Sequence, residues 1–396
     1  MTTSTQVICD FTQAEVTERI SRAQAIMKSK GWEHLLVIDE GGAGVRYLAG
    51  LSHIAPPSPA YMIIPASGEA TLLAGNAMMG TTLNQLEKYT YVKVKPILGK
   101  GYVGDLPGTI AEVITASGYK GGPLAVDGVP LLRDGLVSGL KAKFPDISFT
   151  NAARTSEIIR LQKSAAEEEN YRRAAVQSYN GMEVFMAVIR PGVRNDDAVQ
   201  EATHVSVMQG AEENLLIHGA GTPWVWGRGS RGDNTFVDGD LVTVELNARF
   251  HGYYAQVCRS WIIGKVDPAK QKLIDDTKRA LDVMYTVAKP GMTGKEIFRA
   301  AEAEAKKAGR EFCDVRWGHG VGLTIGECFD FADWDTAPGG PCSTPIPEGA
   351  HGNFHPFFII QGSNGRGQYN ALWGDPWIMG KNGVELLVDK PRAQQP

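Results

Sequence analysis

The sequence predicts a two-domain protein of the α/β (α+β) class, with the boundary between residues 155 and 156. At 396 residues, the chain is longer than a single hydrophobic core usually serves. Residues 1–155 alternate helical and strand patterns, whereas residues 156–396 carry two similar units in which one helix ends at Pro-Gly and another follows. We therefore expect an N-terminal α/β domain and a C-terminal domain with internal pseudo-symmetry.

The first domain shows apolar runs of strand length between amphipathic stretches. Residues 14–30 form an amphipathic helix pattern that ends at Gly31, a residue suited to a left-handed C-cap. Gly41–Gly44 lacks the Lys-Ser/Thr of a phosphate-binding loop, so we interpret it as a loop near a site. The other expected elements are strands at 34–38, 61–64, 70–73, 124–126 and 147–150, and helices at 106–117 and 130–144.

Capping signals mark the helices of the second domain. A Ser or Thr followed three residues later by Glu satisfies the first backbone N–H groups of a helix, and Pro-Gly stops one. These starts and stops are, in order, Ser164 with Glu167, Pro191-Gly192, Asn195, Pro268, Pro290-Gly291, and Thr293 with Glu296. The repeat predicts two related halves, whose interface is a natural place for a site.

Residues 238–265 predict a β-hairpin with polar side chains near its centre. Leu241–Val244 and Ala255–Ile263 are rich in β-branched and aromatic residues, and His251-Gly252 supplies the turn. Polar groups among apolar neighbours must face a site or find buried partners, although a surface hairpin with one wet face would give the same pattern. The polar residues are Glu245, Gln256, Cys258 and Arg259.

Two histidines follow in motifs that leave the imidazole accessible. His319 lies between glycines in Gly318–Gly322, and His355 precedes Pro356 on a candidate strand. Imidazole titrates near neutral pH, so both are candidate acid/base groups, although a lone histidine is more often structural. Glu327, at the end of the same glycine-rich stretch, is a further candidate catalytic residue.

Composition excludes several classes of function. The net charge of -4, without a Lys/Arg stripe, does not suggest a nucleic-acid partner. The sequence shows neither an 18-residue apolar segment nor a secretion-signal pattern, so we expect no membrane partner and a cytoplasmic location. Five cysteines, an odd number without a CxxC pair, argue against a disulfide framework and a zinc ribbon.

Six stretches occur in the order of a known family's motifs. They are Gly239–Val242, Gly252–Tyr254, Arg259-Ser260, Gly318–Gly322, His355-Pro356 and Asn382-Gly383. The chain thereby resembles the pita-bread family (peptidase family M24-like), which holds creatinase, prolidase, Xaa-Pro aminopeptidase and methionine aminopeptidase. Residues 45–50 are similar to a hallmark loop of the creatinase N-terminal domain. The resemblance implies a creatinase-like domain at 1–155, a pita-bread catalytic domain at 156–396, and a homodimer in which residues 54–59 help to close the other subunit's pocket.

The resemblance also implies where metal would bind, and there the chain departs from the pattern. The family's peptidases hold two metal ions with two Asp, one His and two Glu. The corresponding residues here are Glu245, Gln256, His319, His355 and Gly374. The carboxylates that would offset two close dications are therefore missing, and we expect no cofactor and no metal. If one ion is bound, its expected ligands are Glu245, His319 and His355.

Creatinase, the family's metal-free precedent, hydrolyses a C–N bond with a histidine as the proton-transfer group. At its histidine and glutamate positions this chain has Arg228, Cys258 and His355, which predicts an anionic small-molecule substrate. The expected substrate-binding residues are Arg228, Glu245, Gln256, Arg259, Trp226 and Trp317, and the expected catalytic residues are His319, His355, Cys258 and Glu327. The tryptophans would be flat walls unless they are core residues, and Cys258 would be a nucleophile unless it is buried and inert.

We therefore expect a metal-independent, creatinase-like hydrolase that cleaves a C–N or related bond in a small carboxylate-bearing metabolite. Three alternatives remain: a lyase acting on a small anionic substrate, a metallo-aminopeptidase, and a non-catalytic pita-bread binding module. Arg259-Ser260-Trp261 is similar to the lyase branch. Convergence of His319, His355 and Cys258 on one site would favour an enzyme over a binding module.

Overall fold

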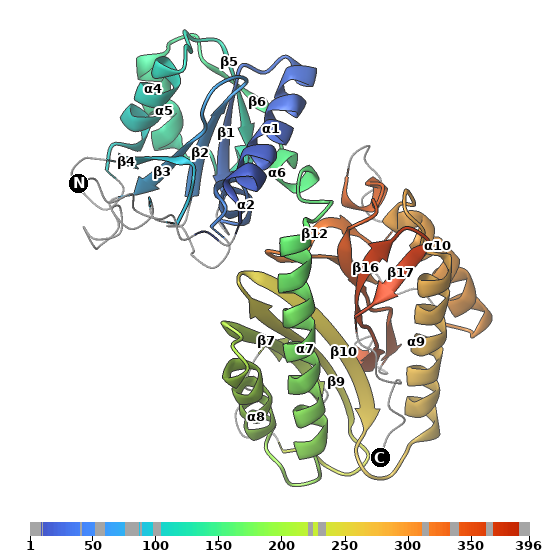
Figure 1. Cartoon of the computed structure of the whole chain (residues 1–396). Helices are drawn as coiled ribbons and strands as arrows, with labels where there is room; N and C mark the ends of the chain where they lie inside the picture. Colours follow the sequence, from blue (N-terminus) through green and yellow to red (C-terminus); the bar gives the residue numbers. More distant parts are fainter. Residues whose placement is uncertain are drawn as a thin grey trace. The chain divides into compact units, whose positions relative to one another are not determined.

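The computed structural model describes residues 9, 11–39, 42–51, 60–75, 87, 89–97, 104–220, 225–228, 235–310, 317–332, 340–361 and 367–387. The chain forms two compact units, residues 1–160 and residues 161–396 (Figure 1). These are called the N-terminal unit and the C-terminal unit below.

A six-stranded mixed sheet forms the centre of the N-terminal unit, in the order β4-β3-β2-β1-β5-β6. Strand β1 is antiparallel to β2 and parallel to β5. The strands are β1 His34–Asp39, β2 Ala60–Pro65, β3 Thr71–Gly75, β4 Lys93–Ile97, β5 Pro123–Asp127 and β6 Ser148–Asn151. The helices are α1 Gln13–Lys30, α2 Ala43–Ala49, α4 Leu106–Ala116, η1 Val129–Leu131, α5 Asp134–Lys143 and α6 Thr155–Ile158. Leu36, Ile110 and Leu140 belong to the core in which α4 and α5 pack on the sheet (Figure 1).

One prediction for this unit is wrong. The loop near a site was expected at residues 41–44, but Ala43 and Gly44 are the first residues of the buried helix α2, Ala43–Ala49. Asp39, at the end of β1, accepts hydrogen bonds from the backbone N–H groups of Gly42 and Gly44 and so caps the helix from the preceding strand. Gly41 lies outside the described residues.

Two further elements differ from expectation. Helix α5 begins at Asp134 rather than Pro130, because residues 129–131 form a separate 3₁₀ turn. Strand β4 was not predicted. Its sequence, Lys-Val-Lys-Pro-Ile, has the lysines and proline of an edge strand, and it lies at the edge of the sheet.

The described residues of the C-terminal unit form three sheets with long helices beside them (Figure 1). The helices are α7 Ala165–Val188, α8 Asn195–Met208, α9 Pro268–Val287, α10 Gly294–Lys307 and the 3₁₀ turn η2 Pro341–Ser343. The four-stranded sheet has the order β10-β9-β7-β8, with β7 Glu213–Ala220, β8 Val225–Arg228, β9 Leu241–Phe250 and β10 Tyr253–Ile262. The five-stranded sheet has the order β12-β11-β13-β16-β17, with β11 Gly318–Val321, β12 Ile325–Asp330, β13 His351–Phe354, β16 Pro376–Gly380 and β17 Gly383–Leu386. The two-stranded sheet pairs β14 Phe357–Gln361 with β15 Gly367–Leu372.

The two Pro-Gly units repeat in the structure, which confirms the internal pseudo-symmetry. After α7, the backbone N–H of Gly192 donates to the carbonyl oxygen of Phe236 at 2.8 Å, and after α9, Gly291 donates to Ile346 at the same distance. Both glycines have a φ of 88°, a left-handed conformation. Strand β9 follows Phe236 and strand β13 follows Ile346, so these strands are equivalent elements of the two halves.

Both predicted capping boxes are present, one at Ser164 with Glu167 and one at Thr293 with Glu296. The prediction for Asn195 is wrong, because Arg194 is the N-cap of α8 and Asn195 is the buried first residue of the helix. The side chain of Arg194 makes no capping hydrogen bond. The backbone of Arg194 instead forms an isolated antiparallel β-bridge with Thr235.

The predicted hairpin is present and longer than expected. Strands β9 and β10 are joined at His251 and Gly252, whose φ values of 43° and 84° provide the tight turn. Val244, Leu246 and Val257 lie on one face of the hairpin and pack with Phe185 of α7. The opposite face is polar and belongs to the candidate site.

No disulfide joins the four cysteines of the described chain, Cys9, Cys258, Cys328 and Cys342. Cys313 lies outside the described residues. None of the described helices combines the length and apolar character needed to cross a bilayer.

Candidate functional site

A polar row crosses the face of the β9–β10 hairpin that points away from α7. Side chains alternate between the two faces of a strand, and directly opposite residues share a face. The pairs on this face are Thr243 with Ser260, Glu245 with Cys258, and Asn247 with Gln256. Glu245 is half-buried and the other five are buried.

The row continues beyond β10 into residues 373–375. Cys258 and Gly374 exchange backbone hydrogen bonds of 2.9 and 3.0 Å. A Cβ atom added to Gly374 would lie closer than 3.0 Å to the Oδ1 atom of Asn353. Asn353, on β13, donates its Nδ2 to the carbonyl oxygen of Gln256 at 2.5 Å. Its amide therefore occupies the space that a side chain at position 374 would need.

The two predicted histidines lie side by side next to this row. The ring centroids of His319 and His355 are 5.0 Å apart, at an interplanar angle of 72°. His319 is opposite Asn353 in the β11–β13 register, and His355 follows β13 directly. His355 thus lies in the link between β13 and β14, not on a strand as expected.

The protonation of His319 follows from its hydrogen bond. Its Nδ1 lies 3.1 Å from the carbonyl oxygen of Gly320. A carbonyl can only accept, so Nδ1 carries the proton and Nε2 is the basic atom of the neutral ring. This assignment gives the site one imidazole nitrogen able to take a proton.

Cys258 is in the protonated, thiol form. Burial and the charge of Glu245 raise the pKa of Cys258 well above its usual range, and the opposing effect of Arg259 is smaller. Only a thiolate is an effective nucleophile. The expected nucleophilic role is therefore not favoured, and Cys258 acts as a small buried residue between Glu245 and Gly374.

Arg259 has protein partners for its charge. Its guanidinium donates to the carbonyl oxygens of Cys258 and Gly374, both at 2.8 Å, and to Asp375 at 2.5 Å. It also lies over the ring of Trp373, 4.8 Å from the centroid. Arg259 was expected to bind substrate, but these contacts fasten residues 373–375 to β10.

Trp317 is a core residue rather than a wall of the site. It is fully buried and packs edge-on against Phe298 and Phe358, with centroid distances of 5.0 and 5.4 Å. The core alternative is therefore the correct one for this tryptophan.

Glu327 was expected to be catalytic and instead forms a buried ion pair. Its Oε1 lies 2.9 Å from Nζ of Lys163. A Cβ atom added to Gly322 would collide with the same carboxylate, so the glycine of the motif makes room for the ion pair. These contacts show that Glu327 supports the packing of the motif, and its catalytic role stays a prediction.

Position 228 lies in the same row of the sheet as the polar residues. Arg228 is opposite Ile217, Ile217 is opposite Glu245, and Glu245 is opposite Cys258. The backbone of Trp226 is on β8, two residues away. Only the backbone of these two residues is described, and residues 54–59 lie outside the described ranges.

Sequence reasoning missed Asn247 and Asn353. Both are fully buried. A signal existed in the sequence, because each asparagine lies two residues from a residue that we had singled out. Asn247 follows Glu245 at this spacing, and Asn353 precedes His355.

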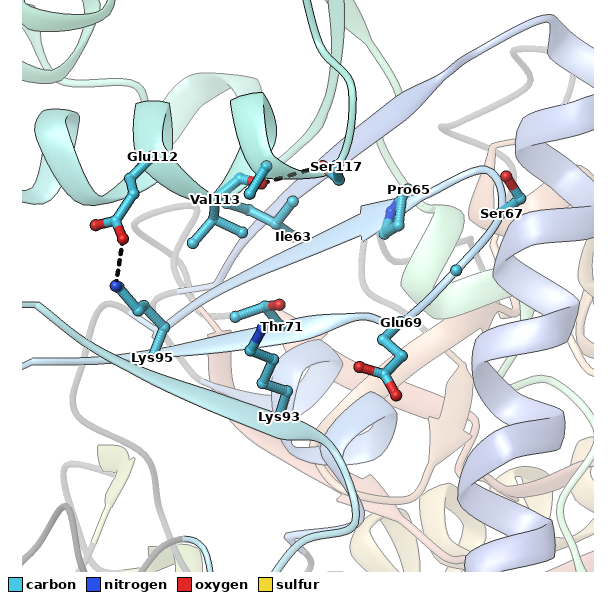
Figure 2. Close-up of a pocket in the computed structure, with 12 residues that line it drawn as sticks. Ile63, Pro65, Ser67, Glu69, Thr71, Lys93, Lys95, Glu112, Val113 and Ser117 are labelled. Atoms are coloured by element: carbon cyan, nitrogen blue, oxygen red, sulfur yellow. Dashed lines mark hydrogen bonds and ion pairs between the residues drawn. The ribbon is translucent and has the colours of Figure 1, made fainter.

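A separate pocket lies in the N-terminal unit, between strands β2 to β4 and helix α4 (Figure 2). Its volume is about 370 Å³, and Lys95 and Glu112 form an ion pair of 2.6 Å at its rim. It contains none of the predicted site residues.

Comparison with known proteins identifies the family. Residues 169–379, more than half of the chain, match the family described as "Metallopeptidase family M24". The chain belongs to metallopeptidase family M24. This M24 protein is 25% identical to the Xaa-Pro dipeptidase of Pyrococcus furiosus over 215 residues, which cover 54% of this chain and 61% of that protein. It is 34% identical over 100 residues to a methionine aminopeptidase of Staphylococcus epidermidis, covering 25% of this chain and 40% of that one. The chain thus matches less than two thirds of the length of either relative.

Solved structures with the same fold include the prolidase from Pyrococcus horikoshii (TM-score 0.77, 20% identity, 95% of this chain and 99% of that one). A Xaa-Pro dipeptidase from Bacillus anthracis gives a TM-score of 0.79 at 20% identity, covering 96% and 99%. The N-terminal domain of the FACT complex subunit SPT16 from Cicer arietinum gives 0.71 at 14%, covering 94% and 96%. The expected pita-bread fold is confirmed.

The residues of this M24 chain do not fit the two metal ions that the family name implies. Within the described ranges, no group of three or more His, Cys, Asp and Glu side chains is arranged to hold a metal ion. The set expected for a single ion, Glu245, His319 and His355, is therefore not arranged as a metal site. The Nε2 atom of Gln256 donates to Oε2 of Glu245 at 3.3 Å, so an amide N–H lies where a bridging carboxylate would be needed. The space beside Gly374 is filled by Asn353.

Proposed function

We propose that this M24 protein is a metal-independent hydrolase that cleaves a C–N bond in a small molecule, in the manner of creatinase. The observation that carries the proposal is the His319–His355 pair, 5.0 Å apart, beside a half-buried carboxylate. A neutral amide at position 256 and a glycine at 374 accompany this pair, in place of two carboxylates. Such a site can move protons at neutral pH without a Lewis acid.

In the proposed reaction, Nε2 of His319 takes a proton from a water molecule as the water oxygen attacks the carbon of the scissile bond. The C–O bond forms, and the same proton is delivered to the nitrogen as the C–N bond breaks. His355 lies close enough to accept or return a proton in one of these steps. Glu245, held by the amide of Gln256, orients the substrate nitrogen.

The anionic end of the substrate is assigned to Arg228, because Arg259 is occupied by Asp375. Position 228 shares its row with Glu245, which supports an elongated substrate with a carboxylate at one end and the scissile nitrogen at the other. The small-molecule substrate and the homodimer remain proposals, and light scattering with size-exclusion chromatography tests the dimer.

A hydrolysis assay in the presence of a chelator tests the proposal. Purified protein is incubated with a panel of small carboxylated amides, ureas and amidines, and with Xaa-Pro dipeptides, while primary amine and ammonia release are measured. We expect C–N hydrolysis of a panel compound that resists chelation and is lost in His319→Ala. Hydrolysis of the dipeptides that needs added metal would instead identify a metallo-aminopeptidase. Binding without turnover would identify a binding module, and loss of an anionic group with formation of a double bond would identify a lyase.

A further inference from the structure

Two buried amide side chains lie on directly opposite residues of the hairpin in the candidate site. Asn247 on β9 is directly opposite Gln256 on β10, and both side chains are 0% exposed. Within the described part of the chain, no donor reaches Oδ1 of Asn247 or Oε1 of Gln256. A buried acceptor without a donor is costly, so such pairs are rarely kept without a purpose.

The orientation of both amides is fixed by their other ends. Nδ2 of Asn247 donates to the carbonyl oxygen of Leu215 at 2.9 Å, and Nε2 of Gln256 donates to Glu245 at 3.3 Å. Both partners can only accept, so flipping either amide would place two acceptors against each other. The amide atoms without a hydrogen-bond partner are therefore the oxygens, Oδ1 of Asn247 and Oε1 of Gln256, and each can accept a hydrogen bond from a ligand.

Other groups of the site agree with this polarity. Glu245 is an acceptor when ionised, and the basic Nε2 of His319 is an acceptor in the neutral ring. Asn353 supplies a third amide oxygen to which no described residue donates a hydrogen bond. Its Nδ2 donates to the carbonyl oxygen of Gln256. The described part of the site thus presents a set of acceptors to whatever enters it.

We propose that Asn247 and Gln256 form a subsite for a terminal NH₂ group on an sp² carbon, as in a carboxamide, carbamoyl or amidine. Its two N–H bonds diverge by a trigonal angle, so two acceptors at hydrogen-bond distance lie about 5 Å apart. Directly opposite side chains on neighbouring strands begin from Cβ atoms about 4.5–5.5 Å apart, which matches this span. The inference rests on the proposed function, because it names the nitrogen-bearing end of the substrate at the same histidines.

A hard cation is the competing occupant, since amide and carboxylate oxygens also bind Ca²⁺ and Mg²⁺. The hydrogen bond from Gln256 to Glu245 argues against it. A cation would recruit the half-buried carboxylate, whereas the structure directs an amide N–H at it. We therefore commit to the NH₂ donor.

Ligand-observed NMR on the full-length protein tests the subsite with matched probes of one size. Acetamide, urea and acetamidine carry the NH₂ group, acetate replaces it by an anion, and acetone replaces it by a methyl group without donors. We expect saturable binding of the first three and weaker binding, by about tenfold, of the last two. Gln256→Met and Asn247→Ala should each weaken binding of the NH₂ probes to the same degree.

Asn214→Ala is the matched control. Its amide oxygen also lacks a donor within the described ranges, but its Nδ2 donates to Ser206 of α8, on the other side of the sheet. This variant should bind the probes like the wild type, and circular dichroism establishes that each variant is folded. An equal loss of probe affinity in all three variants would overturn the proposal. Preferred binding of acetate, or displacement of the probes by Ca²⁺ or Mg²⁺ alone, would also overturn it. So would the absence of saturable binding for every NH₂ probe. Probe binding without hydrolysis of any substrate would refute the proposed function alone, whereas hydrolysis unaffected by both site variants would refute the subsite alone.

Discussion

Removing the carboxylate from the Lys163–Glu327 ion pair is expected to destabilise the C-terminal unit by about 3–5 kcal/mol. The two side chains are only 2% and 1% exposed, and Nζ lies 2.9 Å from Oε1. Glu327→Gln keeps the size of the side chain but leaves the buried lysine without this charge. Little water can replace the lost partner, so nearly the whole penalty should appear in the free energy of unfolding.

Urea unfolding at neutral pH, followed by tryptophan fluorescence and circular dichroism, measures the effect. Glu302→Gln is the matched control, because Glu302 pairs with Arg299, whose side chain is 49% exposed. That variant should lose less than about 1 kcal/mol. The double variant Lys163→Met with Glu327→Leu should recover much of the loss, since it removes both buried charges.

The same ion pair predicts how stability depends on alkaline pH. Burial lowers the pKa of Lys163, but the charges of Glu327, Cys328 and Glu167, together with the hydrogen bond to Glu327, outweigh this effect and raise the pKa above its ordinary value of 10.5. The stabilisation is therefore complete below pH 10.5 and is lost as the pH rises through the higher folded-state pKa. The reasoning is refuted if Glu327→Gln unfolds within about 0.5 kcal/mol of the wild type. A loss of activity at unchanged stability would restore the catalytic role.

Further predictions concern the site and its support. Gly374→Ala should lower the free energy of unfolding by about 1–3 kcal/mol, because its Cβ would collide with Asn353. Gly135→Ala, with no atom near its Cβ, should not lower it in the same assay. Burial and, to a smaller extent, the charges of Lys163 and Arg172 lower the pKa of His351 well below 6.5, so this histidine supports stability above that pH. Wild-type stability should fall as the pH drops below 6.5, and His351→Phe should flatten this dependence while the exposed His204→Gln does not. Cys258→Ser should keep its hydrolytic activity, and native Cys258 should resist iodoacetamide until the protein unfolds, because its raised pKa leaves little thiolate. Loss of hydrolysis in this variant at wild-type stability would return Cys258 to the nucleophile role.

Features with short-range causes were predictable from the sequence. The capping boxes at Ser164 and Thr293, the C-cap at Gly31 and the turn at His251-Gly252 each depend on residues within a few positions of one another. Helix α2 was missed because its N-cap is Gly42, which has no side chain, and the carboxylate that accepts from its first N–H groups belongs to Asp39 of the preceding strand. The order of the motifs was sufficient to predict the fold, because each motif corresponds to one strand or turn.

The site was predictable in its positions but not in its contacts. His319 and His355 were recognised from their motifs, and the structure brings them together. The roles of Arg259 and Glu327 depend on Asp375 and Lys163, residues more than a hundred positions away in the chain, which no local pattern reveals. From the sequence, we assigned Arg259 to substrate binding and Glu327 to catalysis, because the buried partner of each charge could not be recognised there.

Metal binding by the purified protein is the most direct test of the central claim that this M24 site works without metal. Protein incubated with Mn²⁺, Co²⁺ or Zn²⁺ is freed of unbound ions, and its metal content is measured by plasma mass spectrometry beside that of His319→Ala. We expect far less than one ion per chain, equal in the wild type and the variant, with hydrolysis unchanged by chelation. One or two ions per chain, lost in His319→Ala together with the activity, would contradict the account and place this chain among the metal-dependent members of its family.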